Sequence, residues 1–316
     1  METETILAKN ITKAGENAAY DAACKRLLAN KIILAWIMKS CIKEYYDLDV
    51  NEIAEHYIEG DPQIAKTALH PDEGEQIRGS NTEDSTISEG TVTYDIRFFA
   101  IAPSTKEPIC LIINIEAQND FYPGYPIIKR GIYYCSRMIS SQYGVEFEES
   151  HYEKIKKVYS IWVCANPPLY RQNTINRYFI QEECLIGGVK EEQENYDLLT
   201  AVVICLGNSG DEKYAGILKL LDVLLSDEKA PEEKKKILQA EFDIRMTRAL
   251  ESEVQSMCNL SKGIEEKGRK DGMKEGILSS VKNLMDTMDW SAEQAMKALK
   301  VSKEDWEKYL VMLKKQ

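Results

Sequence analysis

Paired cysteines are missing from this 316-residue sequence. Its eight cysteines are scattered singly, none of them forms a C-x-x-C pair, and several lie inside apolar runs. Cysteines distributed in this way are typical of buried thiols in a reducing compartment. The distribution also argues against a zinc site built from cysteine ligands, because such sites need several thiolates at close spacing.

A long apolar run is missing as well. A helix needs roughly 20 consecutive apolar residues to span a bilayer, and no run in the chain approaches that length. The sequence METETILAKN at the start lacks the apolar stretch of a signal peptide. We therefore expect a cytoplasmic protein without a membrane partner. Hydrophobic residues nevertheless make up 44% of the chain, which suffices for a buried core and argues against global disorder.

The sequence has no overall excess of positive charge. Its formal net charge is −12, whereas proteins that bind nucleic acids usually present basic surfaces. Residues 123–181 differ from the rest, with eight Lys or Arg against four Glu, and with Trp162 and several tyrosines between them. This segment is either an ordinary mixed surface or a face that binds a nucleic-acid backbone, and the sequence leaves both interpretations open.

The expected secondary structure of the first part of the chain mixes helices with strands. Side-chain periodicity predicts a long helix over residues 18–46 and a short helix near 50–57. Residues 59–90 are rich in Gly, Pro, Asp, Asn and Ser and are predicted to be irregular. Two strands, a helix and three more strands are predicted to follow, at 91–100, 109–118, 127–143, 157–165, 176–184 and 199–206. This order predicts a layered α/β or α+β domain over residues 1–210.

Helices alone are predicted for the remainder of the chain. Residues 211–261 are expected to be a helical extension whose second helix runs from Pro231 to about residue 258. Residues 262–276 (KGIEEKGRKDGMKEG) are charged and repeat glycine, which predicts a linker or a frayed helix. Residues 277–316 are predicted to form a small module of three short helices. Its last two helices are either a hairpin for packing or homo-oligomer formation, or a helix-turn-helix that reads DNA.

Three polar residues of the first strand pair form the candidate site. Alternation of side chains along a strand places Glu116 and Gln118 on one face, and antiparallel pairing would bring Asp95 close to Glu116. Glu116 ends the apolar run LIINIE, where an unpaired charge costs free energy. One Asp, one Glu and a backbone carbonyl such as that of Ala117 are the hard oxygen ligands that Mg²⁺ prefers. The spacing by itself also fits a solvated acidic face.

A divalent cation at this position would have a defined chemistry. It would polarise a phosphate and lower the pKa of an attacking water, and both are needed to cut a phosphodiester. Gln118 could hydrogen-bond that water, but its amide carries no charge. The strand pair therefore points to metal-dependent phosphodiester hydrolysis.

The motifs around these residues resemble the PD-(D/E)XK nuclease superfamily. Specifically, EGTVTYDIRF, LIINIEAQ, YPIIKRGIYYCSRMISSQYG, KKVYSIWVC and MCNLSKG are similar to its nuclease-family transposases, which are related to the recombination-promoting nucleases. The resemblance covers nearly the whole chain. It implies a restriction-endonuclease-like core of order α-β-β-β-α-β, with a central mixed sheet flanked by helices. It also implies a DNA endonuclease that uses Mg²⁺, with Mn²⁺ as a substitute, and that is linked to recombination or mobile elements.

The resemblance also implies roles for particular positions. It makes Asp95 and Glu116 metal ligands and catalytic residues, and it places Gln118 where the motif has a lysine. Arg130 and Tyr134 on the next helix would contact the phosphate or support the acids; the alternative is a surface arginine and a packed tyrosine.

Glu44 and Gln118 each allow two interpretations. An acid from the first helix often joins sites of this family, and Glu44 is the nearest candidate, although a solvated helix end is the simpler explanation of this residue. The neutral amide of Gln118 and the net acidity of the chain also fit a second function. The chain would then be a nucleic-acid-binding or assembly protein on a nuclease scaffold, with weak or no catalysis.

Overall fold

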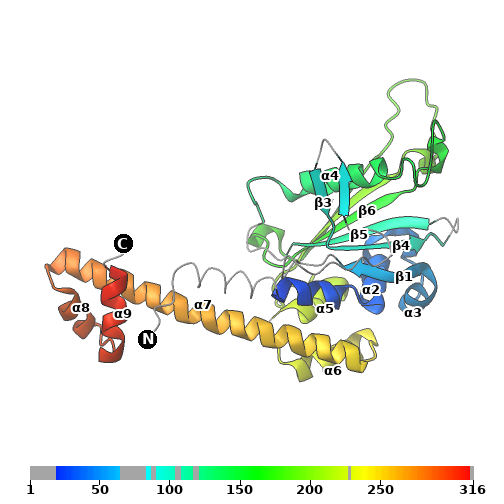
Figure 1. Ribbon diagram of the computed structural model, residues 1–316. Coiled ribbons are helices and arrows are strands. Elements are labelled where there is room, and N and C mark those ends of the chain that lie inside the picture. Colours follow the sequence, from blue (N-terminus) through cyan, green and yellow to red (C-terminus); the bar gives the residue numbers. More distant parts are fainter. Residues whose placement is uncertain are drawn as a thin grey trace. The chain divides into compact units, whose positions relative to one another are not determined.

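The computed structural model of the chain describes residues 19–64, 83–86, 90–103, 108–116, 121–226 and 229–313 (Figure 1). The chain divides into two compact units, Met1–Cys258 and Asn259–Gln316. Within the described ranges, no helix combines the length and the apolar character that crossing a bilayer requires.

A six-stranded mixed sheet forms the centre of the larger unit (Figure 1). In spatial order its strands are β1 (Ile58–Ile64), β4 (Ile96–Ile101), β5 (Pro108–Glu116), β6 (Val158–Cys164), β8 (Leu199–Cys205) and β7 (Thr174–Phe179). The pairs β1–β4, β4–β5 and β7–β8 are antiparallel, whereas β5–β6 and β6–β8 are parallel. A separate antiparallel hairpin consists of β2 (Glu83–Thr86) and β3 (Gly90–Thr93). The predicted mixed α/β class is therefore confirmed.

Helices cover both faces of this sheet (Figure 1). One face lies under α4 (Ile127–Ser140), and the other lies against α2 (Lys31–Cys41) and α5 (Gly216–Leu225). Because both faces are covered, every residue of β6 is buried, which accounts for its apolar sequence VYSIWVC. The other helical elements of this unit include residues 19–28, η1 (Lys43–Tyr45), α3 (Val50–Glu52), η2 (Ile53–Tyr57), η3 (Tyr152–Lys154), η4 (Leu169–Arg171), η5 (Gln193–Asn195) and α6 (Pro231–Phe242).

The N-terminal helix is interrupted where we expected it to continue. Residues 19–28 are helical, a turn follows, and α2 begins after Asn30. The Asn30 side chain accepts a hydrogen bond from the backbone N–H of Ile32, which is the role of an N-cap residue. The prediction of one helix over 18–46 was therefore wrong, because the apolar periodicity continues across a capped helix start.

The strand predicted over 91–100 is also divided. β3 ends at Thr93, Asp95 lies at a bend, and β4 begins at Ile96. The segment predicted to be irregular contains strand β1, which includes Pro62 and lies at the edge of the sheet. An edge strand tolerates proline because one side of the strand needs no backbone N–H for a neighbour. The helix predicted before β6 is confirmed as α4, and the strands predicted at β6 and β8 are confirmed. The strand predicted over 176–184 is present as β7, which begins earlier and ends at Phe179.

The helices after the sheet differ from the prediction in their boundaries. α6 ends at Phe242, and Asp243 adopts left-handed backbone with φ 51°. The next helix, α7, spans Arg248–Met288. The single helix predicted from Pro231 to about residue 258 is therefore two helices, and the charged segment 262–276 is helical backbone within α7.

The smaller unit has a hydrophobic core of its own. It comprises the last part of α7, α8 (Ala292–Ala298) and α9 (Lys303–Leu313). Val281 of α7 packs with Met296 of α8 and Tyr309 of α9. A capping box begins α8, in which the Ser291 hydroxyl accepts from the Gln294 N–H and the Gln294 side chain accepts from the Ser291 N–H. The three helices predicted over 277–316 are thus present, the first as the end of a longer helix.

Candidate functional site

Asp95 lies at the bend before β4 and carries an ion pair. Its Oδ1 lies 2.9 Å from Nζ of Lys25, which belongs to the helical segment of residues 19–28. The same ammonium lies 2.5 Å from Oδ2 of Asp21, one turn earlier in that segment. One cation therefore joins two carboxylates, one from the N-terminal helical segment and one from the start of β4.

The Lys25 ammonium is charged although it is nearly inaccessible to solvent. Its side chain is 9% exposed, against 24% for Asp95 and 29% for Asp21. Burial alone would lower the pKa of Lys25, but its interactions with Asp21 and Asp95 outweigh burial and hold the pKa above its ordinary value. The group thus keeps a positive charge in the interior of the larger unit.

Glu116 is the last residue of β5, and its position follows from the register of two strand pairs. On the antiparallel side, Ile96 of β4 pairs with Ile113 of β5. Asp95 lies directly before Ile96, and Glu116 lies three residues after Ile113 on β5. Both acids therefore lie at the same end of the two paired strands. On the parallel side, Glu116 pairs with Cys164, the last residue of β6.

Arg130 and Tyr134 of α4 form a contact pair over the sheet. Nε and Nη2 of Arg130 donate to the Tyr134 hydroxyl at 3.1 and 2.8 Å. The guanidinium carbon lies 5.2 Å from the ring centroid of Tyr134 and 5.3 Å from that of Trp162, as in cation–π contacts. Trp162 pairs in register with Asn114, two residues before Glu116. Arg130 therefore lies over the part of the sheet that leads to the end of β5.

Tyr134 links this pair electrostatically with Asp95. Its ring packs edge-on against the ring of Tyr94, the residue before Asp95, with centroids 5.4 Å apart. Burial raises the pKa of Tyr134; Arg130 opposes this increase, and the negative charge of Asp95 adds to it. The hydroxyl is therefore protonated at neutral pH. Tyr134 is a packed tyrosine, as one of the two interpretations expected, whereas Arg130 is half-buried and not fully exposed on the helix surface.

Glu44 is placed apart from this group. It lies in η1, where it accepts from Lys157 Nζ at 3.0 Å and from the Tyr159 hydroxyl at 2.6 Å. Lys157 directly precedes β6, whose opposite end pairs with Glu116. A strand of this length, seven residues, measures roughly 20 Å. Glu44 is therefore neither the additional acid of the predicted site nor a solvated helix end, since its charge is paired at the other end of the sheet.

The sequence interpretation missed Asp21 and Lys25. Their spacing of four residues puts them on one face of a helix and marks them as an ion pair. That spacing was a usable signal, but it does not reveal their partner. Asp95 lies far along the chain, so its contact with Lys25 depends on the tertiary fold.

The donor atoms near Lys25 suit a hard cation, although the described residues supply only part of a ligand set. Among these residues, no group of three or more His, Cys, Asp or Glu side chains is placed to hold a metal ion. Asp21 and Asp95 supply carboxylate oxygens that already surround one positive charge, and such oxygens are the ligands Mg²⁺ prefers. Ala117 and Gln118 lie outside the described residues, and Glu116 is placed by its backbone.

Comparison of the chain with protein-family models, with curated proteins and with solved structures gives no match. The chemistry of the site itself is then the guide to its function. Its components are a half-buried acid before β4, a buried cation on that acid, an arginine held by α4, and the acidic end of β5.

Proposed function

We propose that the chain is a Mg²⁺-dependent DNA endonuclease of the PD-(D/E)XK type, with Mn²⁺ as a substitute metal. The observation that carries the proposal is the position of half-buried Asp95 at the same end of the β4–β5 pair as Glu116. The order of elements also supports it. α2, β1, β4, β5, α4 and β6 follow the order α-β-β-β-α-β of a restriction-endonuclease-like core, with the β2–β3 hairpin inserted after β1.

The roles proposed for the side chains follow from their chemistry. Asp95 and Glu116 would hold the cation, with the backbone carbonyl of Ala117 as a further oxygen. A bound Mg²⁺ would polarise the scissile phosphate and lower the pKa of the attacking water. Lys25 would hold the Asp95 carboxylate in place through their ion pair. Arg130, fixed by Tyr134, would offer its guanidinium to a phosphate oxygen.

A plasmid-nicking assay tests this proposal. Purified protein should convert supercoiled plasmid to open circles with Mg²⁺ or Mn²⁺, and chelation by EDTA should stop the reaction. Asp95→Asn and Glu116→Gln should each abolish nicking, whereas Glu55→Gln, a matched change at an exposed acid of η2, should leave it intact. Equal activity in the Asp95 variant and the wild type would contradict the assignment of the site.

The buried ion pair favours a second function. Lys25 already neutralises much of the charge that Asp95 and Asp21 would offer to a metal. A nucleic-acid-binding or assembly protein on the same scaffold, with weak or no catalysis, is consistent with this arrangement and with the neutral Gln118. Isothermal titration calorimetry separates the two functions: DNA binding without any heat of Mg²⁺ binding would favour the second.

A further inference from the structure

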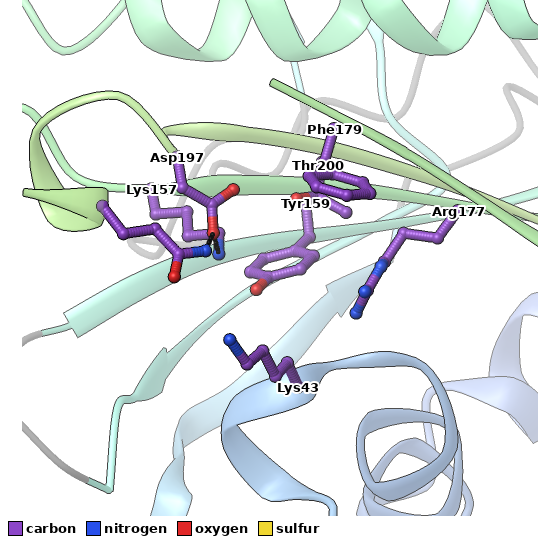
Figure 2. A pocket seen from close by; sticks show the side chains of 8 residues that line it. Lys43, Lys157, Tyr159, Arg177, Phe179, Asp197 and Thr200 are labelled. Atoms are coloured by element: carbon purple, nitrogen blue, oxygen red, sulfur yellow. Dashed lines mark hydrogen bonds and ion pairs between the residues drawn. The ribbon is translucent and has the colours of Figure 1, made fainter. Parts of the chain in front are cut away.

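A cavity of about 210 Å³ lies at the opposite end of the sheet from Asp95. Figure 2 shows the side chains that line it, which come from η1, from the starts of β6 and β8, from β7 and from the region of η5. The lining residues that decide its chemistry are Lys43, Lys157, Tyr159, Arg177, Phe179 and Asp197.

One cation of the cavity, Lys157, has two carboxylate partners, so this group of three side chains carries one negative charge. Nζ of Lys157 lies 2.7 Å from Oδ2 of Asp197 and 3.0 Å from Oε1 of Glu44. The Tyr159 hydroxyl donates to the other oxygen of Glu44 at 2.6 Å. Burial, together with the charge of Glu44, raises the pKa of Tyr159. Its hydroxyl therefore stays protonated and adds no negative charge to the cavity.

The other two cations have no carboxylate partner within the described part of the chain. Figure 2 shows Lys43 and Arg177 pointing into the space beside Tyr159. Arg177 donates to the Tyr46 hydroxyl at 3.3 Å, which leaves its charge uncompensated. Its guanidinium carbon lies 5.1 Å from the ring centroid of Phe179. Both side chains are exposed to water, and an anion between them would reduce their mutual repulsion.

We propose that this cavity binds a small phosphate monoester. A guanidinium fork matches two oxygens of a phosphoryl group, and an ammonium supplies a compact point charge. A phosphate group placed between Lys43 and Arg177 would interact with both cations and would bring the net positive charge of the cavity close to balance. The exposed ring of Phe179 would offer a flat apolar surface to the organic part of the ester.

The size of the cavity limits the ligand. A volume of about 210 Å³ is below the range of roughly 300–1,000 Å³ that is typical of sites for drug-sized molecules. It would hold a phosphoryl group and a small organic substituent. The proposal does not depend on nuclease activity, because the cavity lies at the other end of the sheet from Asp95 and Glu116 and uses neither of them.

Isothermal titration calorimetry with inorganic phosphate and with phenyl phosphate tests this site. We expect saturable binding of both, with phenyl phosphate binding more tightly because its ring can pack on Phe179. Lys43→Gln and Arg177→Gln should each weaken binding at least tenfold, and Arg177→Lys should weaken it too, because lysine keeps the charge but loses the fork. Lys154→Gln, a change at an exposed lysine outside the cavity, is the matched control and should bind as the wild type does.

Three outcomes with the small ligands would overturn the proposal. They are an absence of saturable heat at millimolar phosphate ester, equal affinity of the wild type and the Lys43 and Arg177 variants, and equal weakening by the Lys154 variant. Circular dichroism spectra that match the wild type would establish that the variants are folded. Binding of a 5′-phosphorylated oligonucleotide without binding of either small ligand would also overturn it, in favour of a site for a nucleic-acid end.

Discussion

Replacement of Lys25 by methionine tests the buried ion pairs that this residue forms with Asp21 and Asp95. Methionine keeps an unbranched apolar side chain but removes the ammonium. The two carboxylates then remain together without the cation that contacts both. Removing one partner of a buried ion pair costs about 3–5 kcal/mol. Because the two carboxylates keep 24% and 29% exposure, water can solvate them in part, and we expect a loss of about 2–3 kcal/mol.

Urea denaturation at neutral pH, followed by tryptophan fluorescence and circular dichroism, measures this loss. Lys154→Met is the matched control at an exposed lysine and should change the free energy of unfolding by less than about 0.5 kcal/mol. Adding Asp95→Asn to Lys25→Met should recover part of the loss, since it removes one of the two like charges.

Mg²⁺ extends the same experiment to the proposed metal site. If the carboxylates beside Lys25 accept a divalent cation, Mg²⁺ should stabilise Lys25→Met more than the wild type, because the ammonium no longer competes for them. At a Mg²⁺ concentration ten times the dissociation constant, the gain is about 1.4 kcal/mol. If Lys25→Met lowers the free energy of unfolding no more than Lys154→Met does, the ion pairs of Lys25 are refuted. Equal effects of Mg²⁺ on variant and wild type would refute the shared cation position.

Three further changes test other parts of the structure. Burial alone would raise the pKa of Glu44, but its hydrogen bond from Tyr159 and the charge of Lys157 lower the pKa overall. The Glu44 carboxylate therefore stabilises the fold above its pKa in the unfolded chain, and this stabilisation is lost as the pH falls through its pKa in the folded protein. Glu44→Gln should therefore be less stable than the wild type at neutral pH, and urea titrations should show this difference shrinking below about pH 4.5; a constant difference would contradict the pairing. Gly131→Ala would place a Cβ 3.1 Å from Nε1 of buried Trp162, so the melting temperature should fall by several degrees despite the better helix propensity of alanine, and a rise would mean that the indole can move. Met296→Ala removes a fully buried side chain from the smaller unit and should cost about 2–5 kcal/mol there; limited proteolysis should then cleave residues 259–316 faster, and an unchanged rate would argue against that core.

Local sequence patterns predicted most of the strands that build the candidate site, but not the bend at Asp95 that divides the first of them. Alternation of side chains predicted the strand pair, and its antiparallel register brings Asp95 and Glu116 to one end of it. The apolar run of β6 predicted a buried strand for an equally local reason, because a strand covered on both faces has no polar side. The strand patterns depend on neighbouring residues, whereas the register between the strands depends on the fold.

Features that depend on distant contacts could not be predicted in this way. Strand β1 has the sequence IEGDPQI, whose Gly, Pro and Asp indicate a loop, and it is a strand because it pairs with β4. The capping role of Asn30 was hidden within a continuous apolar periodicity. The contact between Lys25 and Asp95 joins two residues whose separation in the chain carries no pattern. The contact of Lys25 with the site could therefore be identified only from the folded structure.

The two sides of the candidate site differ in how firmly the backbone holds them. Strand β5 is kept in register from two directions, by β4 on one edge and by β6 on the other, and a slip of one residue would break both sets of hydrogen bonds and reverse its faces. The main chain at Glu116 is thus anchored in the sheet. Asp95 lies at a bend, outside the paired residues of β3 and β4. The Asp95 side chain is instead held by its ion pair with Lys25, so backbone pairing fixes the position of one acid and a side-chain contact fixes that of the other.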